Sequence, residues 1–279
     1  MAAPEIAASA APRLTPAALT WLDALGLAPV FVRRELVVSA SPEPTVPAEP
    51  PPAADAERSD AAATASGRGA DAPPECAITA GCAERPALIA GMDWAELAAT
   101  TQACRACRLG SGRQQAVFGT GSARARWLIV GEAPGAEEDR LGEPFVGAAG
   151  KLLDAMLAAI GLDRKADDAR AVYIANVLKC RPPGNRNPAP DEVAQCAPLL
   201  QRQIALLQPR IIVALGRFAA QSLVGGNAPI SQLRGQVLRH NGIPVVVSYH
   251  PACLLRNPAD KARVWRDLCL ARKVAAEAA

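Results

Sequence analysis

Four cysteines in the second half of the chain have the spacing of ligands to one inorganic centre. Cys104 and Cys107 form a C-x2-C pair, and Cys180 and Cys196 follow further along the sequence. A C-x2-C pair presents two thiolates to one metal from a single turn, and a second pair would complete four ligands. Four thiolates suit either tetrahedral zinc or an iron–sulfur cluster. The spacing predicts a cysteine-ligated centre and leaves both kinds open.

Polar or glycine-rich residues stand where four short apolar segments end. The segments are 127–130, ending at Gly131–Gly135; 171–177, with Asn176 near its end; 210–215, ending at Gly216; and 245–248, ending at Tyr249-His250. Bulky, β-branched runs of this length are typical of buried strands. In an open parallel sheet, ligands bind just beyond the carboxyl ends of the strands. We therefore expect these ends to meet at one crevice, with Asn176 and His250 facing it.

The elements that must position these residues alternate along the chain. Helical spacing of large apolar residues predicts helices over 148–160, from a cap at Asp191 to about 207, and over about 259–274, and Asp93 is expected to cap an earlier helix. Asn241-Gly242 between two apolar runs predicts a hairpin. Strands alternating with helices predict a three-layer α/β/α domain with a central, mainly parallel sheet.

The first third of the chain differs in composition from the rest. Residues 1–38 contain a leucine-rich stretch and a possible strand, which we interpret as a small helix/strand element of unknown role and a candidate for binding a protein partner. Residues 39–91 are rich in Ala, Pro, Ser, Asp and Glu and have few large apolar side chains to offset the entropy of ordering. We expect a disordered linker there, and a compact domain over residues 92–279.

Composition narrows the class of protein. The 279 residues carry a formal net charge of +3, which is compatible with nucleic acid without being diagnostic. No apolar run is long enough to span a membrane, and the N-terminus lacks the pattern of a secretory signal. We expect a cytoplasmic protein, whose eight cysteines are metal ligands or free thiols rather than disulfides. Cys253 and Cys269 have no partner at ligand spacing, so we interpret them as ordinary small apolar residues.

From about Cys104 to Leu270 the chain resembles the family 4 uracil-DNA glycosylases, the iron–sulfur, thermostable type. The residues that carry the resemblance are the four cysteines, Gly131-Glu-Ala-Pro-Gly135, Gly142-x-Pro-Phe-Val-Gly147, Tyr173-Ile-Ala-Asn-Val-x-Lys-Cys-Arg-Pro-Pro183 and Tyr249-His-Pro-Ala-x-Leu-Leu-Arg256. The resemblance implies a monomeric bacterial enzyme, associated with the nucleoid, that removes uracil from single- or double-stranded DNA and starts base excision repair. It says nothing about residues 1–91.

The resemblance also implies a role for each matched residue. The residues expected to bind substrate are Gly131, Glu132, Ala133, Gly135, Glu138, Phe145, Asn176 and His250. Among them, Phe145 would stack on uracil, Asn176 would pair with the pyrimidine edge, His250 would face O2, and Glu138 would crowd the C5 edge. Leu254, Leu255 and Arg256 would enter the duplex, and Cys104, Cys107, Cys180 and Cys196 would hold a structural [4Fe–4S] cluster.

The residue types suit this chemistry. A glycosylase must extrude its nucleotide from the stack, and an apolar wedge can fill the space that it leaves. A fixed amide such as Asn176 pairs with uracil but leaves unmatched buried groups with cytosine. A neutral imidazole at His250 can stabilise the negative charge that develops on O2. Some related families position water with an aspartate where this chain has Ala133, so we leave the water-activating group open between Glu132, Glu138 and backbone carbonyls.

Two other functions fit part of the pattern. A non-catalytic iron–sulfur module could bind uracil or single-stranded DNA through the same residues. A relative that traps uracil-DNA covalently would carry a histidine in the loop after the second motif, and Arg181–Pro188 has none. Zinc in place of the cluster is the main alternative for the cofactor.

Overall fold

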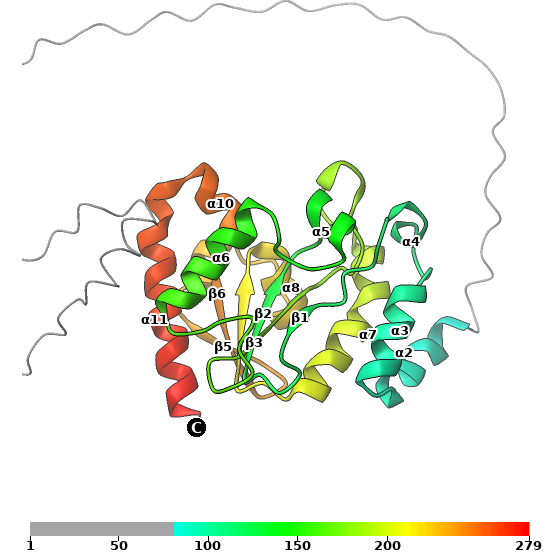
Figure 1. Cartoon of the computed structure of the whole chain (residues 1–279), viewed down its shortest axis with the longest axis horizontal. Coiled ribbons are helices and arrows are strands. Elements are labelled where there is room, and N and C mark those ends of the chain that lie inside the picture. The colour runs from blue at the N-terminus through cyan, green and yellow to red at the C-terminus, as the bar shows by residue number, and fades with distance from the viewer. Residues whose placement is uncertain (1–80, 279) are drawn as a thin grey trace, which may run out of the picture.

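A six-stranded sheet lies at the centre of the protein, whose computed structural model describes residues 81–278 (Figure 1). Its strands are β1 Thr120–Gly121, β2 Trp127–Gly131, β3 Val172–Asn176, β4 Ile211–Leu215, β5 Val237–His240 and β6 Ile243–Ser248. They are ordered β1-β3-β2-β4-β6-β5. The four inner strands are parallel, and the two edge strands pair antiparallel. The mainly parallel sheet is therefore confirmed, as is the hairpin at Asn241-Gly242, which joins β5 to β6.

Helices cover both faces of the sheet and complete the three layers (Figure 1). One face packs against α6 Ala148–Ala159, α10 Pro251–Arg256 and α11 Lys261–Glu277, which follows the short η2 Pro258–Asp260. The other face packs against α7 Pro190–Leu207 and α8 Arg217–Val224, with α9 Ile230–Leu233 beside them. The inner strands β2, β3 and β4 are buried at every position, as expected for parallel strands covered on both faces.

A third apolar cluster lies beside α7, away from the centre of the sheet. It joins α7 to α2 Gly81–Gly91, α3 Trp94–Ala103 and α4 Leu109–Gly112 and includes two of the four cysteines predicted as ligands. The side chain of Ile89 is buried in it, and Arg85 Nη1 donates to the carbonyl of Gln195 at 2.6 Å.

Helix α2 corrects the predicted linker, which was expected to run to residue 91. The helix offers few large apolar residues, and its packing against α7 is a tertiary effect that composition does not reveal. The rest of the linker and residues 1–38 lie outside the described residues. Within residues 81–278 no helix is long and apolar enough to cross a membrane.

The helix caps were predicted with mixed success. Asp93 caps α3 as expected, in a capping box closed by Glu96. The prediction for Asp191 is wrong: α7 begins after Ala189, and Asp191 lies in its first turn. Pro190 takes the first helical position, and the carboxylate of Glu192 accepts the Ala189 N–H at 2.9 Å.

Candidate functional site

The carboxyl ends of β2, β3 and β6 border one cavity of about 420 Å³, a size typical of small-molecule sites. The pairing of β2 with β3 places Gly131 beside Asn176. Just beyond Asn176, the backbone N–H groups of Val177 and Leu178 donate to the carbonyls of Gly131 and Glu132, each at 3.0 Å. The lining residues that the sequence predicted are Glu132, Ala133, Gly135, Glu138, Phe145, Asn176, His250 and Arg256. The ends of three of the four predicted strands therefore meet at this cavity. Gly216, at the end of β4, and the predicted substrate-binding Gly131 are not among its lining residues.

Phe145 is held in an unusual backbone conformation. Its φ is +56°, in the left-handed region that non-glycine residues rarely adopt. Its carbonyl packs directly on Gly150, where a Cβ would overlap it. A Cβ at Gly131 would lie 2.6 Å from Cζ of the ring, so glycine is needed there for the ring to reach the floor of the cavity. The conformation brings the edge of the ring, at Cζ and Cε2, against the end of β2.

Asn176 places a buried amide beside that ring. The residue is 2% exposed, and its Oδ1 has no hydrogen-bond partner within the described residues. Buried polar side-chain atoms nearly always have a partner, and an exception calls for a specific explanation. Since Asn176 lines the cavity, a ligand with a complementary polar edge is the partner that this geometry suits.

The ring of His250 stacks on Phe145, with centroids 5.3 Å apart and planes inclined by 28°. Its Nδ1 accepts the N–H of Ala252 at 3.2 Å, at the start of α10. Because Nδ1 accepts, the proton of the neutral ring lies on Nε2, which remains a donor. Burial lowers the pKa of His250 to about 4, with a further lowering by Arg256 and a small opposing effect of Glu138. The imidazole is therefore neutral at neutral pH.

The two carboxylates at the cavity have different surroundings. Glu138 accepts backbone N–H groups from Gly135 at 3.1 Å, Val146 at 2.9 Å and Gly147 at 3.1 Å, and so ties the start of α5 Ala136–Leu141 to the segment that carries Phe145. Glu132 is half-buried, and burial raises its pKa above the ordinary value, against the opposing effect of Arg217. The carboxylate of Glu138 is committed to the backbone, whereas that of Glu132 is available to the cavity.

The predicted duplex-entering residues do not behave alike. Leu254 is 1% exposed and packs in the core with residues of α6 and α11. Its assignment to the intercalating loop was therefore wrong. Leu255 is 49% exposed, and Arg256 is exposed at the rim of the cavity. Successive positions of the six-residue helix α10 point to different sides, which a linear motif does not reveal.

Part of the cavity wall was not predicted from the sequence. Pro182, Asn185, Arg186 and Asn187 come from the loop after β3, around η1 Pro183–Asn185, and Arg186 is held by the buried carboxylate of Glu192. Their closeness in sequence to Cys180 could have indicated that they line the cavity.

Cys253 was also misassigned. This residue was expected to be an ordinary small apolar residue, but it is exposed and lines the cavity. Its position three residues after His250 placed it near the site, but a lone cysteine carries no pattern that shows on which side of the helix it lies.

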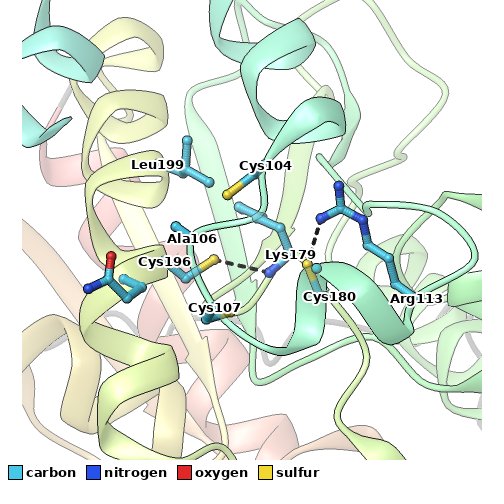
Figure 2. A pocket seen from close by; sticks show the side chains of 10 residues that line it. Cys104, Ala106, Cys107, Arg113, Lys179, Cys180, Cys196 and Leu199 are labelled. Carbon is cyan, nitrogen blue, oxygen red and sulfur yellow. Dashed lines mark hydrogen bonds between the residues drawn. The ribbon is translucent and has the colours of Figure 1, made fainter. Parts of the chain in front are cut away.

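The four predicted ligand cysteines surround a second, smaller cavity between α4, α7 and the end of β3 (Figure 2). Three donors point at their sulfurs: Arg113 Nη1 lies 2.8 Å from Cys180 Sγ, Arg85 Nη2 lies 3.5 Å from Cys104 Sγ, and the Lys179 N–H lies 3.3 Å from Cys196 Sγ. Such donors suit electron-rich thiolates bound to a metal, so the residues fit a cysteine-ligated group.

The side-chain positions themselves do not form a metal site. Within residues 81–278, no group of three or more His, Cys, Asp or Glu is arranged to hold a metal ion. Burial raises the pKa of the Cys180 thiol and raises that of Cys196 to about 11.

Comparison with known proteins identifies the class. The model of the uracil DNA glycosylase superfamily matches residues 118–269, and the chain belongs to this superfamily. The chain is 47% identical to the type-4 uracil-DNA glycosylase of Archaeoglobus fulgidus, over 56% of this chain and 79% of that protein. It is 42% identical to the type-4 enzyme of Pyrobaculum aerophilum, over 64% and 93%, and 43% identical to that of Thermotoga maritima, over 57% and 82%. Within the superfamily it is a member of the type-4 group.

Proposed function

We infer that this protein removes uracil from DNA as the first step of base excision repair, in keeping with its type-4 relatives. The observation that carries this conclusion is the shared cavity of Phe145, Asn176 and His250. It joins an aromatic ring, a buried amide whose Oδ1 is unpartnered within the described residues, and a neutral imidazole donor. These are the groups needed to stack, identify and activate one extruded pyrimidine.

The amide selects the base. Asn176 offers a donor and an acceptor together, which match O4 and N3–H of uracil. Cytosine has an amino group and an unprotonated N3 at these positions, so a fixed amide would leave buried polar groups unpaired. Unpaired buried groups give the stronger kind of discrimination between substrates. Phe145 supplies a stacking surface that accepts any base, so it contributes affinity rather than selectivity.

The imidazole and the loop after β2 act on the bond. Breaking the N-glycosidic bond leaves cationic character on the sugar and negative charge on uracil. His250 Nε2 donates to O2, where that charge develops, and backbone N–H groups of Gly131–Gly135 add to it. A neutral donor is sufficient because the uracil anion is a tolerable leaving group. We assign orientation of the attacking water to Glu132.

Glu132→Gln should lower the single-turnover excision rate at neutral pH by about 10²-fold, the lower end of the range for a general base. The active form of Glu132 is ionised, so the wild-type rate falls as pH drops through its raised pKa. The variant lacks this dependence, and its acid limb should move down toward the pKa of His250, at about 4. A pH–rate profile with the wild-type acid limb in a Glu132→Gln enzyme would contradict the assignment.

Glu138→Gln provides the matched comparison. Glutamine keeps one acceptor oxygen for the three N–H groups that Glu138 binds through two, so the tie between Gly135 and the segment that carries Phe145 should loosen. We expect a lower melting temperature and weaker binding of free uracil, without a shift of the acid limb. Wild-type single-turnover rates in both glutamine variants would exclude any carboxylate assistance.

Leu255→Ala should lower excision from double-stranded DNA by roughly tenfold and leave excision from single strands nearly unchanged, because only the duplex needs a wedge. Its neighbour is the control. Leu254→Ala should lower the free energy of unfolding by about 3 kcal/mol, as for other buried leucines, and should affect both substrates alike. If the two variants lost excision from double-stranded DNA, relative to single-stranded DNA, by the same factor, the assignment of Leu255 as the wedge and Leu254 as a core residue would be refuted.

We further propose that Cys104, Cys107, Cys180 and Cys196 bind a [4Fe–4S] cluster that stabilises the fold. The support is the cavity that the four cysteines line, together with the donors aimed at three of the sulfurs. When bound, the cluster acts as a structural cross-link. Iron and acid-labile sulfide in the purified protein, with broad absorbance near roughly 400 nm, would separate it from zinc.

Incubation of a uracil-containing oligonucleotide with the protein, followed by alkali, tests the function. Hydrolysis leaves an abasic site, and alkali then cuts the strand. Intact DNA after alkali would instead support a non-catalytic module that binds uracil or single strands, and a covalent protein–DNA adduct would support the trapping alternative. We propose that the enzyme acts as a monomer on single- or double-stranded DNA in the bacterial cytoplasm, associated with the nucleoid.

A further inference from the structure

Lys179 is a buried cation whose position the proposed chemistry does not use. Its side chain is 1% exposed, and within the described residues it forms no ion pair with a carboxylate. Burying an ammonium group without a carboxylate is costly, so its remaining contacts must compensate.

The ammonium group binds two neutral oxygens. Nζ donates to the backbone carbonyl of Asn176 at 2.9 Å and to Gln203 Oε1 at 2.6 Å. Gln203 is itself buried and donates from Nε2 to the carbonyl of Phe118 at 2.9 Å. The lysine therefore fastens the last residue of β3 to α7, the helix that also carries Cys196.

The same residue lies among the sulfurs. Lys179 lines the cysteine cavity, as Figure 2 shows, and its backbone N–H reaches Cys196 Sγ at 3.3 Å. Cys180 is the next residue in the chain. Bound thiolates would supply the negative charge that the buried ammonium otherwise lacks. Lys179 thus stands between two sites: its backbone N–H reaches a sulfur of the cysteine cavity, and its Nζ binds the carbonyl of Asn176.

We propose that Lys179 is a positioning residue: it fixes Asn176 through its carbonyl and so ties the amide that reads uracil to α7. This inference rests on the proposed function. Asn176 itself touches the base, and Lys179 acts only through it. The amide must be held rigidly to discriminate between pyrimidines, and a charge-assisted hydrogen bond to its own backbone is a strong means of holding it.

Lys179→Met tests the proposal, because methionine keeps much of the side-chain length and removes both the charge and the donors. Binding of free uracil by calorimetry and the single-turnover rate should each weaken by about tenfold or more. Affinity for undamaged duplex should stay within about twofold of wild type. Lys165→Met, at an exposed turn, is the control and should change none of these quantities.

Weaker binding of free uracil together with unchanged affinity for undamaged DNA would indicate a positioning role. General damage to the fold would instead weaken the binding of both. Lys179→Gln, which lacks the charge and keeps a shorter donor, carries the same test if the methionine variant is insoluble. A folded variant of either kind that binds uracil within about twofold of wild type would overturn the inference. A wild-type protein that leaves uracil in DNA would instead overturn the proposed function.

Discussion

Asn176→Ala is expected to lower the single-turnover rate of uracil excision by about 10²- to 10³-fold, the usual cost of removing one preorganised polar group from an active site. The alanine removes the side-chain amide that lies buried at the end of β3. Its loss takes away the groups that pair with O4 and N3–H. Stacking on Phe145 and donation by His250 remain, so some activity should persist.

Affinity for undamaged DNA gives the control for that measurement. Asn176 is buried at the floor of the cavity and does not reach the surface that a duplex would contact. Binding of undamaged duplex should therefore be nearly unchanged. Asn227→Ala, in an exposed loop, should match wild type in both assays. An equal loss of excision and duplex affinity in Asn176→Ala would show that the residue supports the fold rather than reads the base.

Cys180→Ser should produce the largest loss of stability. Binding of a metal group by cysteines contributes directly to folding, and loss of one ligand should lower the free energy of unfolding by about 4 kcal/mol or more. We expect poor solubility, depleted iron and a low melting temperature. Uracil excision by the fraction that remains folded and loaded should fall less, because Cys180 does not line the uracil cavity.

Cys269→Ser is the matched control, since Cys269 lies on α11, away from the cysteine cavity. Its iron content and melting temperature should equal those of wild type. If Cys180→Ser kept full iron content and wild-type stability, the four cysteines would not be the ligands of one structural cluster. Zinc in place of iron in the wild-type protein would correct the cofactor and leave the fold argument unchanged.

The inner strands were predictable because each is a short run of mostly apolar residues, several of them β-branched, that ends sharply. Trp127–Gly131 and Ile211–Leu215 are buried at every position, so their apolar character is continuous and easily recognised. Parallel strands then bring their carboxyl ends to the same edge, which is why Asn176 and His250 could be placed together before any coordinates.

Features set by side-chain direction could not be predicted. Leu254 and Leu255 are chemically identical neighbours, and only the orientation of α10 buries one and exposes the other. The positive φ of Phe145 depends on Gly131 and Gly150, which are distant in sequence from one another. The backbone bonds of Glu138 likewise arise from the turn between α5 and α6, which no local pattern specifies.

Helix α2 is a whole element that could not be predicted from the sequence. Its isolated sequence has little apolar surface, and it is ordered by its contact with α7 through Ile89 and Arg85. Lys179 is the sharpest case, because a lysine in a sequence normally predicts exposure. Its burial follows from the cysteines and the strand end that meet around it.

The central claim is that one cavity recognises uracil through Phe145, Asn176 and His250, and a crystal structure of the protein with free uracil tests it most directly. The account predicts uracil stacked on Phe145, with its O4 and N3 edge on the Asn176 amide and O2 at His250 Nε2. Uracil bound in another cavity, or bound here with the Asn176 amide unpaired, would contradict it.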